Sequence, residues 1–215
     1  MRIVAGRFKG RPLAGPKSEA IRPTSDRVRE SLFNILDHGI ADFSIEGARV
    51  LDLFAGTGAL GLEAVSRGAA SCLFVEEDAQ ARGLIRANVE AMALTGVTKL
   101  FRRDATRLGP AGKLGQFDLV LLDPPYGKGL GEAALGAAIE GGWIAAGAVV
   151  VLEERADVAV SLPAALARLD SDVILIIHSL TLRCPQIGGQ AHFAAHFEQA
   201  WSGRLVKTSA LNAST

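Results

Sequence analysis

The sequence predicts an α/β fold, in which a mostly parallel sheet carries helices on both faces and follows a small amino-terminal hairpin and helix. From residue 48 onward, short apolar runs that suit buried strands alternate with segments at helical spacing. Such a βαβα order needs crossover connections, which place helices over both faces of a parallel sheet. Hydrophobic residues make up 49% of the 215 residues, which is enough for one sizeable core.

The boundaries of the expected elements follow the apolar runs and the glycines and prolines between them. Helices are expected at residues 26–38, 60–66, 78–94, 130–139 and 162–169, and strands at 48–54, 71–76, 98–102, 117–122, 147–153 and 173–177. In the first helix an apolar stripe predicts the buried face, and Arg27 and Arg29 are expected outside it. We therefore expect a basic extension at 1–46, an α/β domain at 47–180 and an atypical carboxyl-terminal tail at 181–215.

The amino-terminal extension concentrates positive charge, although the formal net charge of the whole chain is zero. Residues 1–30 contain eight Lys and Arg against three Asp and Glu. Short apolar pieces flank Arg7-Phe8-Lys9-Gly10, a pattern typical of a hairpin with a basic tip. Basic side chains interleaved with an aromatic ring favour contacts to a nucleic acid, with a solvated strand pair as the alternative. The candidate contacts are Arg7, Lys9, Arg11, Arg22 and Arg27.

Targeting signals are not apparent in this sequence. Met1–Arg7 has no apolar h-region, so no signal peptide is expected. The longest apolar stretch, residues 133–152, is interrupted at 140–142 and is expected to form a helix followed by a strand. Cys72 and Cys184 are expected to be reduced in a chain without a secretion signal. We expect a cytoplasmic monomer with no membrane partner.

The strand expected at 48–54 leads into the glycine loop Asp52-Leu53-Phe54-Ala55-Gly56-Thr57-Gly58. Glycines here let the backbone turn tightly and approach a ligand closely. Together with Gly61 they match the G-x-G-x-x-G pattern of dinucleotide-binding loops, a weak signal alone. Asp52 can face a cationic ligand, and no hydride-transfer machinery follows it. These two features favour a cofactor other than a nicotinamide.

Carboxylates also follow the next two expected strands. The second strand ends in Glu76-Glu77-Asp78, where a carboxylate can accept both hydroxyls of a ribose. We assign this role to Glu76, because Asp78 and Glu77 also suit the amino-terminal end of the next helix. Asp104 lies just past the third strand and can accept a hydrogen bond from an adenine amino group.

The most informative segment is Asp123-Pro124-Pro125-Tyr126, which closes the apolar run Phe117–Leu122. An amine attached to an aromatic ring is a poor nucleophile until its lone pair is reoriented. The Asp123 carboxylate and the Pro124 carbonyl offer two acceptors to the two hydrogens of such an amine. Tyr126 can stack on an extruded base. The segment resembles the Asp/Asn-Pro-Pro-Tyr/Phe motif of amino methyltransferases, with an ordinary strand-ending turn as the alternative.

Four segments in this order resemble the RsmD family, bacterial enzymes that methylate the exocyclic N2 of a guanine in 16S ribosomal RNA. They are Met1–Gly6, Arg22-Pro23-Thr24 with the following residues to Asn34, Asp52–Gly58 and Asp123–Tyr126. The resemblance covers about residues 1–155. Beyond it, the Tyr-Gly-Asp-Thr-like turn that usually enters the family's last strand is replaced near Leu169-Asp170.

The resemblance implies a class I methyltransferase fold that uses S-adenosylmethionine, and an RNA-binding role for the extension at 1–46. It implies catalytic roles for Asp123, Pro124 and Tyr126, the last also gripping the guanine. Arg22 would contact both RNA and cofactor. No metal is expected. The cofactor residues implied are Arg22, Thr24, Asp52, Phe54, Gly56, Thr57, Gly58, Glu76 and Asp104.

The expected partner is 16S ribosomal RNA or the assembling small ribosomal subunit. The same two acceptors would serve a methyltransferase acting on adenine or cytosine in DNA, or on a glutamine amide in protein. A non-catalytic RNA-binding protein on a methyltransferase scaffold is a further alternative. A nicotinamide oxidoreductase is a more distant one.

Overall fold

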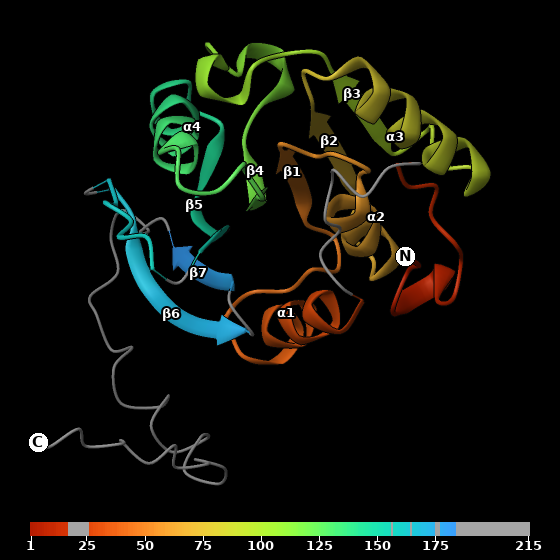
Figure 1. Ribbon diagram of the computed structural model, residues 1–215, viewed down its shortest axis with the longest axis horizontal. Helices are drawn as coiled ribbons and strands as arrows, with labels where there is room; N and C mark the ends of the chain where they lie inside the picture. Colours follow the sequence, from red (N-terminus) through yellow and green to blue (C-terminus); the bar gives the residue numbers. More distant parts are fainter. Residues whose placement is uncertain (17–25, 156, 164, 175–176, 184–215) are drawn as a thin grey trace, which may run out of the picture. The chain divides into compact units, whose positions relative to one another are not determined.

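A seven-stranded sheet organises the residues that the computed structural model describes, which are 1–16, 26–155, 157–163, 165–174 and 177–183 (Figure 1). The strands are β1 Arg49–Leu53, β2 Ser71–Val75, β3 Thr98–Phe101, β4 Phe117–Leu122, β5 Ile144–Arg155, β6 Ala167–Ile174 and β7 Ile177–Arg183. Their order across the sheet is β3-β2-β1-β4-β5-β7-β6. The first five are parallel, and β7 pairs antiparallel with both β5 and β6.

Helices cover both faces of this sheet. Alternate residues of each central strand point to opposite sides, so each strand gives apolar residues to two separate core clusters. The helices are α1 Asp26–His38, α2 Ala59–Ser66, α3 Ala79–Ala91 and α4 Leu130–Glu140, with short 3-10 helices η1 Gly6–Phe8, η2 Ala105–Arg107 and η3 Gly112–Leu114. One core cluster joins Val50 and Leu119 to residues of α1, α2 and α3. The other joins Leu51 and Val120 to α4 and to the η2 and η3 segments. The predicted α/β fold is confirmed.

The carboxyl-terminal part of the domain differs from expectation. The helix expected at 162–169 is wrong, because the chain forms β6 from Ala167 onward. Pairing with β7 satisfies the backbone of this segment, and such tertiary contacts override the local preference of an Ala- and Leu-rich stretch for a helix. The strand expected at 173–177 divides between the end of β6 and the start of β7. β7 then ends at Arg183, three residues past the expected boundary at 180.

Two smaller expectations concern cysteines and membrane spans. Cys72 is buried in β2 as expected, and burial raises the pKa of its thiol. Cys184 lies outside the described residues, as does most of the expected tail at 181–215. In the part of the chain that the structure describes, we find no helix that is both long and apolar enough to span a membrane.

The first 16 residues form an arm that folds back on itself and docks against α2. Arg2 and Pro12 form an antiparallel bridge, and η1 occupies the tip of the expected hairpin. The tip approaches α2 very closely, since a Cβ on Gly6 would lie 2.0 Å from the Ser66 carbonyl oxygen. Ser66 also accepts a hydrogen bond from the Phe8 amide at 3.0 Å. Glycine is therefore required where the arm meets the helix.

A buried ionic cluster around Glu63 of α2 secures this arm. The Glu63 carboxylate is fully buried and accepts hydrogen bonds from the Val4 and Ala5 amides at 2.8 and 2.9 Å. It also pairs with Arg67 at 2.9 Å and lies 3.8 Å from Arg29. A buried carboxylate is tolerated here because four donors surround it.

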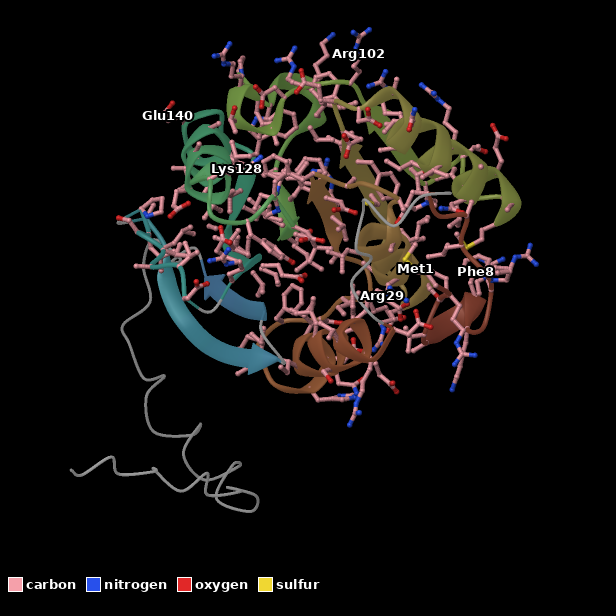
Figure 2. All side chains as sticks on the ribbon, in the orientation of Figure 1. Met1, Phe8, Arg29, Arg102, Lys128 and Glu140 are labelled. Carbon is pink, nitrogen blue, oxygen red and sulfur yellow. The ribbon has the colours of Figure 1, made fainter. Side chains whose placement is uncertain are left out.

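The position of Arg29 differs from the one predicted for it on α1. We expected this side chain outside the apolar stripe of the helix, but it is fully buried and points inward from α1 (Figure 2). Its guanidinium donates to the Arg2 carbonyl and pairs with Asp26 at 2.8 Å. The apolar pattern could not reveal this, because the buried acceptors come from the arm and from α2.

Asn88 of α3 makes a second clamp on the arm. Its side-chain oxygen accepts from the Ala14 amide at 2.7 Å, and its amide group donates to the Ala14 carbonyl at 3.1 Å. The same amide group donates to the Thr57 carbonyl at 3.0 Å. Since Asn88 is almost fully buried, these bonds tie the arm directly to the glycine loop.

Replacing Glu63 tests whether the buried cluster holds the arm. Glu63→Ala removes one buried acceptor from Arg29 and from Arg67 and the side-chain acceptor of two backbone amides, so the free energy of unfolding should fall by about 3–5 kcal/mol. Urea denaturation measures this loss, and limited proteolysis should show earlier cleavage within residues 1–16. Glu140→Ala is the control, because Glu140 projects from the exposed end of α4 (Figure 2). Equal stability of the two variants would contradict the assignment.

Candidate functional site

The register of four parallel strands places the candidate residues in one row at the carboxyl edge of the sheet. Val75 of β2 aligns with Leu53 of β1, Leu53 aligns with Leu122 of β4, and Leu122 aligns with Leu152 of β5. The residues that follow these four are therefore neighbours across the sheet. They are Glu76, Phe54, Asp123 and Glu153.

A cavity of about 580 Å³ opens beside this row. Of the predicted cofactor residues, Phe54, Glu76 and Asp104 line it. Its wall continues along the start of α3, along η2 and to Pro125 of the Asp-Pro-Pro-Tyr motif. Ligand pockets of proteins commonly have volumes of roughly 300–1,000 Å³, so this cavity has room for a nucleoside.

Glu76 shapes the glycine loop from the neighbouring strand. Its carboxylate accepts from the Gly56 amide at 2.8 Å and from the Asp78 amide at 2.8 Å. Gly56 has a φ of +56°, in the left-handed region that glycine adopts readily. Phe54 has a φ of +57°, which costs a non-glycine residue about 1–3 kcal/mol. Strain of this size is characteristic of ligand-binding turns.

Asp52 lies beneath the loop rather than in the cavity wall. It is almost fully buried, and its carboxylate accepts from the Gly61 amide in the first turn of α2 at 2.9 Å. A Cβ on Gly61 would lie 2.5 Å from the Cys72 sulfur, so only glycine lets α2 pack this closely. Burial, followed by the charges of Asp123 and Glu76, raises the pKa of Asp52 well above its usual value. A cation bound nearby would relieve this repulsion.

Asp104 forms the far side of the cavity. Its carboxylate caps η2 by accepting from the Thr106 amide at 2.8 Å and from the Thr106 hydroxyl at 2.7 Å. These hydrogen bonds lower the pKa of Asp104, which keeps the group ionised and able to accept at neutral pH. Its other oxygen lies 4.0 Å from the exposed Arg107.

The Asp-Pro-Pro-Tyr motif lies next to Phe54, directly after β4. Asp123 and Tyr126 are half-buried, whereas Pro124 is buried. The Tyr126 hydroxyl lies 2.8 Å from Glu153 and 3.3 Å from Asp123. Burial and then the charges of these two carboxylates raise the pKa of Tyr126, so its hydroxyl stays protonated. Tyr126 and Asp123 are thus held together at one end of the site.

Sequence reasoning missed the two carboxylates that support this motif from β5. Glu153 and Glu154 are both almost fully buried. Glu154 accepts from the Gly127 amide at 2.9 and 3.1 Å, and so holds the backbone just after Tyr126. A signal was present, because Glu153 follows an apolar run at the position that Glu76 and Asp123 occupy after theirs, and Glu154 comes directly after it.

The remaining predicted residues fall into three groups. Arg22 and Thr24 lie outside the described residues. Thr57 is buried in the loop, with its hydroxyl 3.9 Å from the Met1 sulfur, and Gly58 adopts a φ of +78° just before α2. The predicted RNA contacts in the described part of the chain are all exposed, namely Arg7, Lys9, Arg11 and Arg27.

Two of these basic residues also have structural contacts. The Arg7 guanidinium covers the Phe8 ring at 5.2 Å, near the outer end of the arm (Figure 2). Arg11 donates to the Ala91 carbonyl at the end of α3 at 2.5 Å. Arg11 therefore also anchors the arm, while Lys9 and Arg27 extend into solvent.

The arrangement as a whole suits a cationic nucleoside ligand beside a flat amine. A nucleoside fits the cavity between Glu76 and Asp104, and a positive group fits beside the buried carboxylate of Asp52. The acceptors of the Asp-Pro-Pro-Tyr motif suit the hydrogens of an amine held against that cation. Group transfer from the nucleoside to the amine is the chemistry that this geometry allows.

Known proteins resemble the chain over most of its length. A family model described as Conserved hypothetical protein 95 matches residues 1–172. Ribosomal RNA small subunit methyltransferase D of Escherichia coli (strain K12) is 37% identical over 157 residues, covering 73% of this chain and 76% of that protein. The Haemophilus influenzae protein of the same name is 34% identical over 159 residues, covering 73% and 80%.

A solved structure shares the arrangement of elements. The Escherichia coli protein yhhF superimposes with a TM-score of 0.73 at 30% identity, covering 86% of this chain and 98% of that one. The fold is that of the class I methyltransferases. The family match spans both the glycine loop and the Asp-Pro-Pro-Tyr motif, and so the chain belongs to the RsmD family, the ribosomal RNA small subunit methyltransferases D.

Proposed function

We propose that this protein transfers a methyl group from S-adenosylmethionine to the exocyclic N2 of a guanine in 16S ribosomal RNA of the small subunit. The observation that carries the proposal is the row of Glu76, Phe54, Asp123 and Glu153 at one sheet edge, beside a nucleoside-sized cavity. In this row the acid proposed to bind the ribose, Glu76, and the acid proposed to bind the amine, Asp123, follow the two strands that flank β1. Family membership supports the same reaction.

The residues present fit S-adenosylmethionine. Glu76 is held by two backbone amides and Asp104 by the Thr106 amide, and both line the cavity. We assign Glu76 to the ribose hydroxyls and Asp104 to the adenine amino group. The buried Asp52 carries a raised pKa beside two other acids, which a cation would stabilise in its ionised form. Bound S-adenosylmethionine supplies an electrophilic methyl group on a positively charged sulfur.

The residues of the chain act mainly by orienting the target amine. Asp123 and the Pro124 carbonyl accept the two amino hydrogens and turn the nitrogen lone pair toward the methyl group. Tyr126 packs on the face of the base, which must leave its stack to enter the site. The new N–C bond would form as the methyl–sulfur bond breaks and leaves a neutral thioether, and the methylated nitrogen would then give its extra proton to the Asp123 carboxylate that already accepts its hydrogen bond. Because no strong base is needed before that step, positioning provides most of the acceleration.

The exposed basic residues supply the expected contacts to RNA. Arg7, Lys9, Arg11 and Arg27 extend from the arm and α1, where phosphates of a folded RNA can reach them. Contacts to phosphates do not distinguish one base sequence from another. They therefore orient the RNA, while the pocket selects the amine. We place the reaction in the cytoplasm, on ribosomal RNA or an assembling small subunit.

Transfer of a labelled methyl group tests the proposal directly. Small ribosomal subunits from cells lacking this protein would be incubated with the protein and labelled S-adenosylmethionine, with duplex DNA and bulk protein in parallel. Digestion of the RNA should recover the label in N2-methylguanosine. Label found only in DNA or only in protein would show that RNA is not the substrate. Absence of label in all three, despite cofactor binding, would contradict the enzymatic role.

Asp123→Ala separates chemistry from cofactor binding. Loss of the acceptor leaves the amine misoriented, so turnover should fall at least about a hundredfold. Because Asp123 is outside the cavity lining, the Kd for S-adenosylmethionine measured by calorimetry should stay within about threefold of wild type. Asp118→Ala, at the opposite end of β4, is the matched control and should retain full turnover. Wild-type turnover by the Asp123 variant would exclude the assigned role.

Glu76→Gln tests the ribose-binding role. Glutamine can still accept from the Gly56 amide, but it offers the ribose hydroxyls no charge. The Kd for S-adenosylmethionine should therefore rise about 10- to 100-fold. Turnover should recover at saturating cofactor, which distinguishes weak binding from damaged chemistry. Glu90→Gln on the exposed side of α3 serves as the control. An unchanged Kd for the Glu76 variant would show that the ribose is bound elsewhere.

A further inference from the structure

Two buried acids near the end of β5 contact the Asp-Pro-Pro-Tyr motif and the residue that follows it. Glu153 is 1% exposed and Glu154 is 2% exposed. Burying a carboxylate is costly unless hydrogen bonds compensate. Glu154 accepts hydrogen bonds from the backbone amides of Gly127 and Arg155, which compensate for its burial. Glu153 instead contacts a side chain of the motif, the Tyr126 hydroxyl, at 2.8 Å.

The strand register explains why Glu153 meets Tyr126. Leu122 and Leu152 are aligned partners on β4 and β5, so Asp123 and Glu153 follow them as neighbours. The chain then turns at the prolines and brings Tyr126 back over both acids. One hydroxyl group thus lies between two carboxylates, at 2.8 Å from Glu153 and 3.3 Å from Asp123.

A tyrosine hydroxyl has a single proton to donate. The contact to Glu153 has the usual length of an O–H···O hydrogen bond, whereas the contact to Asp123 is longer than that range, so the hydroxyl donates mainly to Glu153. If Glu153 were absent, the same proton would turn toward Asp123. It would then compete with the substrate amine for the oxygen that orients the lone pair.

We propose that Glu153 is a positioning residue for methyl transfer, which accepts a hydrogen bond from the Tyr126 hydroxyl, fixes the tyrosine ring and directs that hydroxyl away from Asp123. The proposal rests on the methyl transfer to an amine inferred above. Glu153 acts through Tyr126 and does not itself touch the substrate. The raised pKa of Tyr126, caused by burial and then by the charges of Asp123 and Glu153, agrees with a hydroxyl that remains a donor.

Glu153→Leu tests this role, because leucine fills a similar buried volume but removes the acceptor and one of the two carboxylates beside the Tyr126 hydroxyl. We expect kcat to fall about 10- to 100-fold, with the Kd for S-adenosylmethionine unchanged and thermal unfolding close to wild type. Asp118→Leu removes a carboxylate that accepts from a backbone amide at the far end of the neighbouring strand, and it is the matched control. Wild-type kcat in the Glu153 variant would overturn the proposal.

A double-mutant cycle separates positioning from a general structural effect. Tyr126→Phe removes the hydroxyl, so Glu153→Leu should then reduce kcat by less than about twofold more. If the double variant instead shows the product of the two single reductions in kcat, Glu153 acts independently of the tyrosine hydroxyl and the proposal is overturned.

Tyr126 is the single tyrosine of the chain, which gives a direct spectroscopic readout. A protein labelled with tyrosine carrying ¹³C at the ring ζ carbon should show one tyrosine resonance. We expect Glu153→Leu to shift this resonance and Asp118→Leu to leave it in place. An unshifted resonance would overturn the proposal. Because this measurement needs no substrate, it still tests the Glu153 contact if the RNA methylation assay fails.

Discussion

The shared register of four parallel strands is the constraint on which the site depends. Each of β2, β1, β4 and β5 delivers its functional residue one position after an apolar residue aligned with those of its neighbours. Side chains alternate between the two faces of a strand, so a slip of one residue would turn every one of these groups to the wrong side. The apolar residues on both faces of the sheet fix that register, and in this way the core determines the geometry of the site.

Several carboxylates lie close together at the carboxyl edge of the sheet, and backbone amides reduce the repulsion between them. Asp52, Glu76 and Glu154 each accept at least one main-chain amide, and Asp52 still has a raised pKa. Carboxylates held by fixed amides cannot move away from one another, so their mutual repulsion persists. A positively charged ligand would relieve that repulsion, and the same feature therefore favours a cationic cofactor.

The basic residues near the amino terminus serve two different purposes. Arg29 is buried in the cluster around Glu63, and Arg11 reaches the end of α3, so both hold the arm in place. Lys9 and Arg27 remain exposed for a partner. Since Asn88 connects Ala14 of the arm to Thr57 of the glycine loop, the docked arm and the cofactor loop support each other. The proposed RNA contacts of the arm and the proposed cofactor loop are thereby joined through Asn88.

The sequence by itself determined the α/β class, the strand ends that carry Asp52, Glu76, Asp104 and Asp123, and the family. Those features depend on local patterns, namely apolar runs, glycines, prolines and short motifs, which neighbouring residues along the chain are sufficient to define. Only the tertiary structure decided the partners of Arg29, the strand in place of the helix expected at 162–169, and the contact of Glu153 with Tyr126. Each of these depends on residues distant in sequence, because burial of a charge or pairing of an edge strand requires acceptors that another element provides.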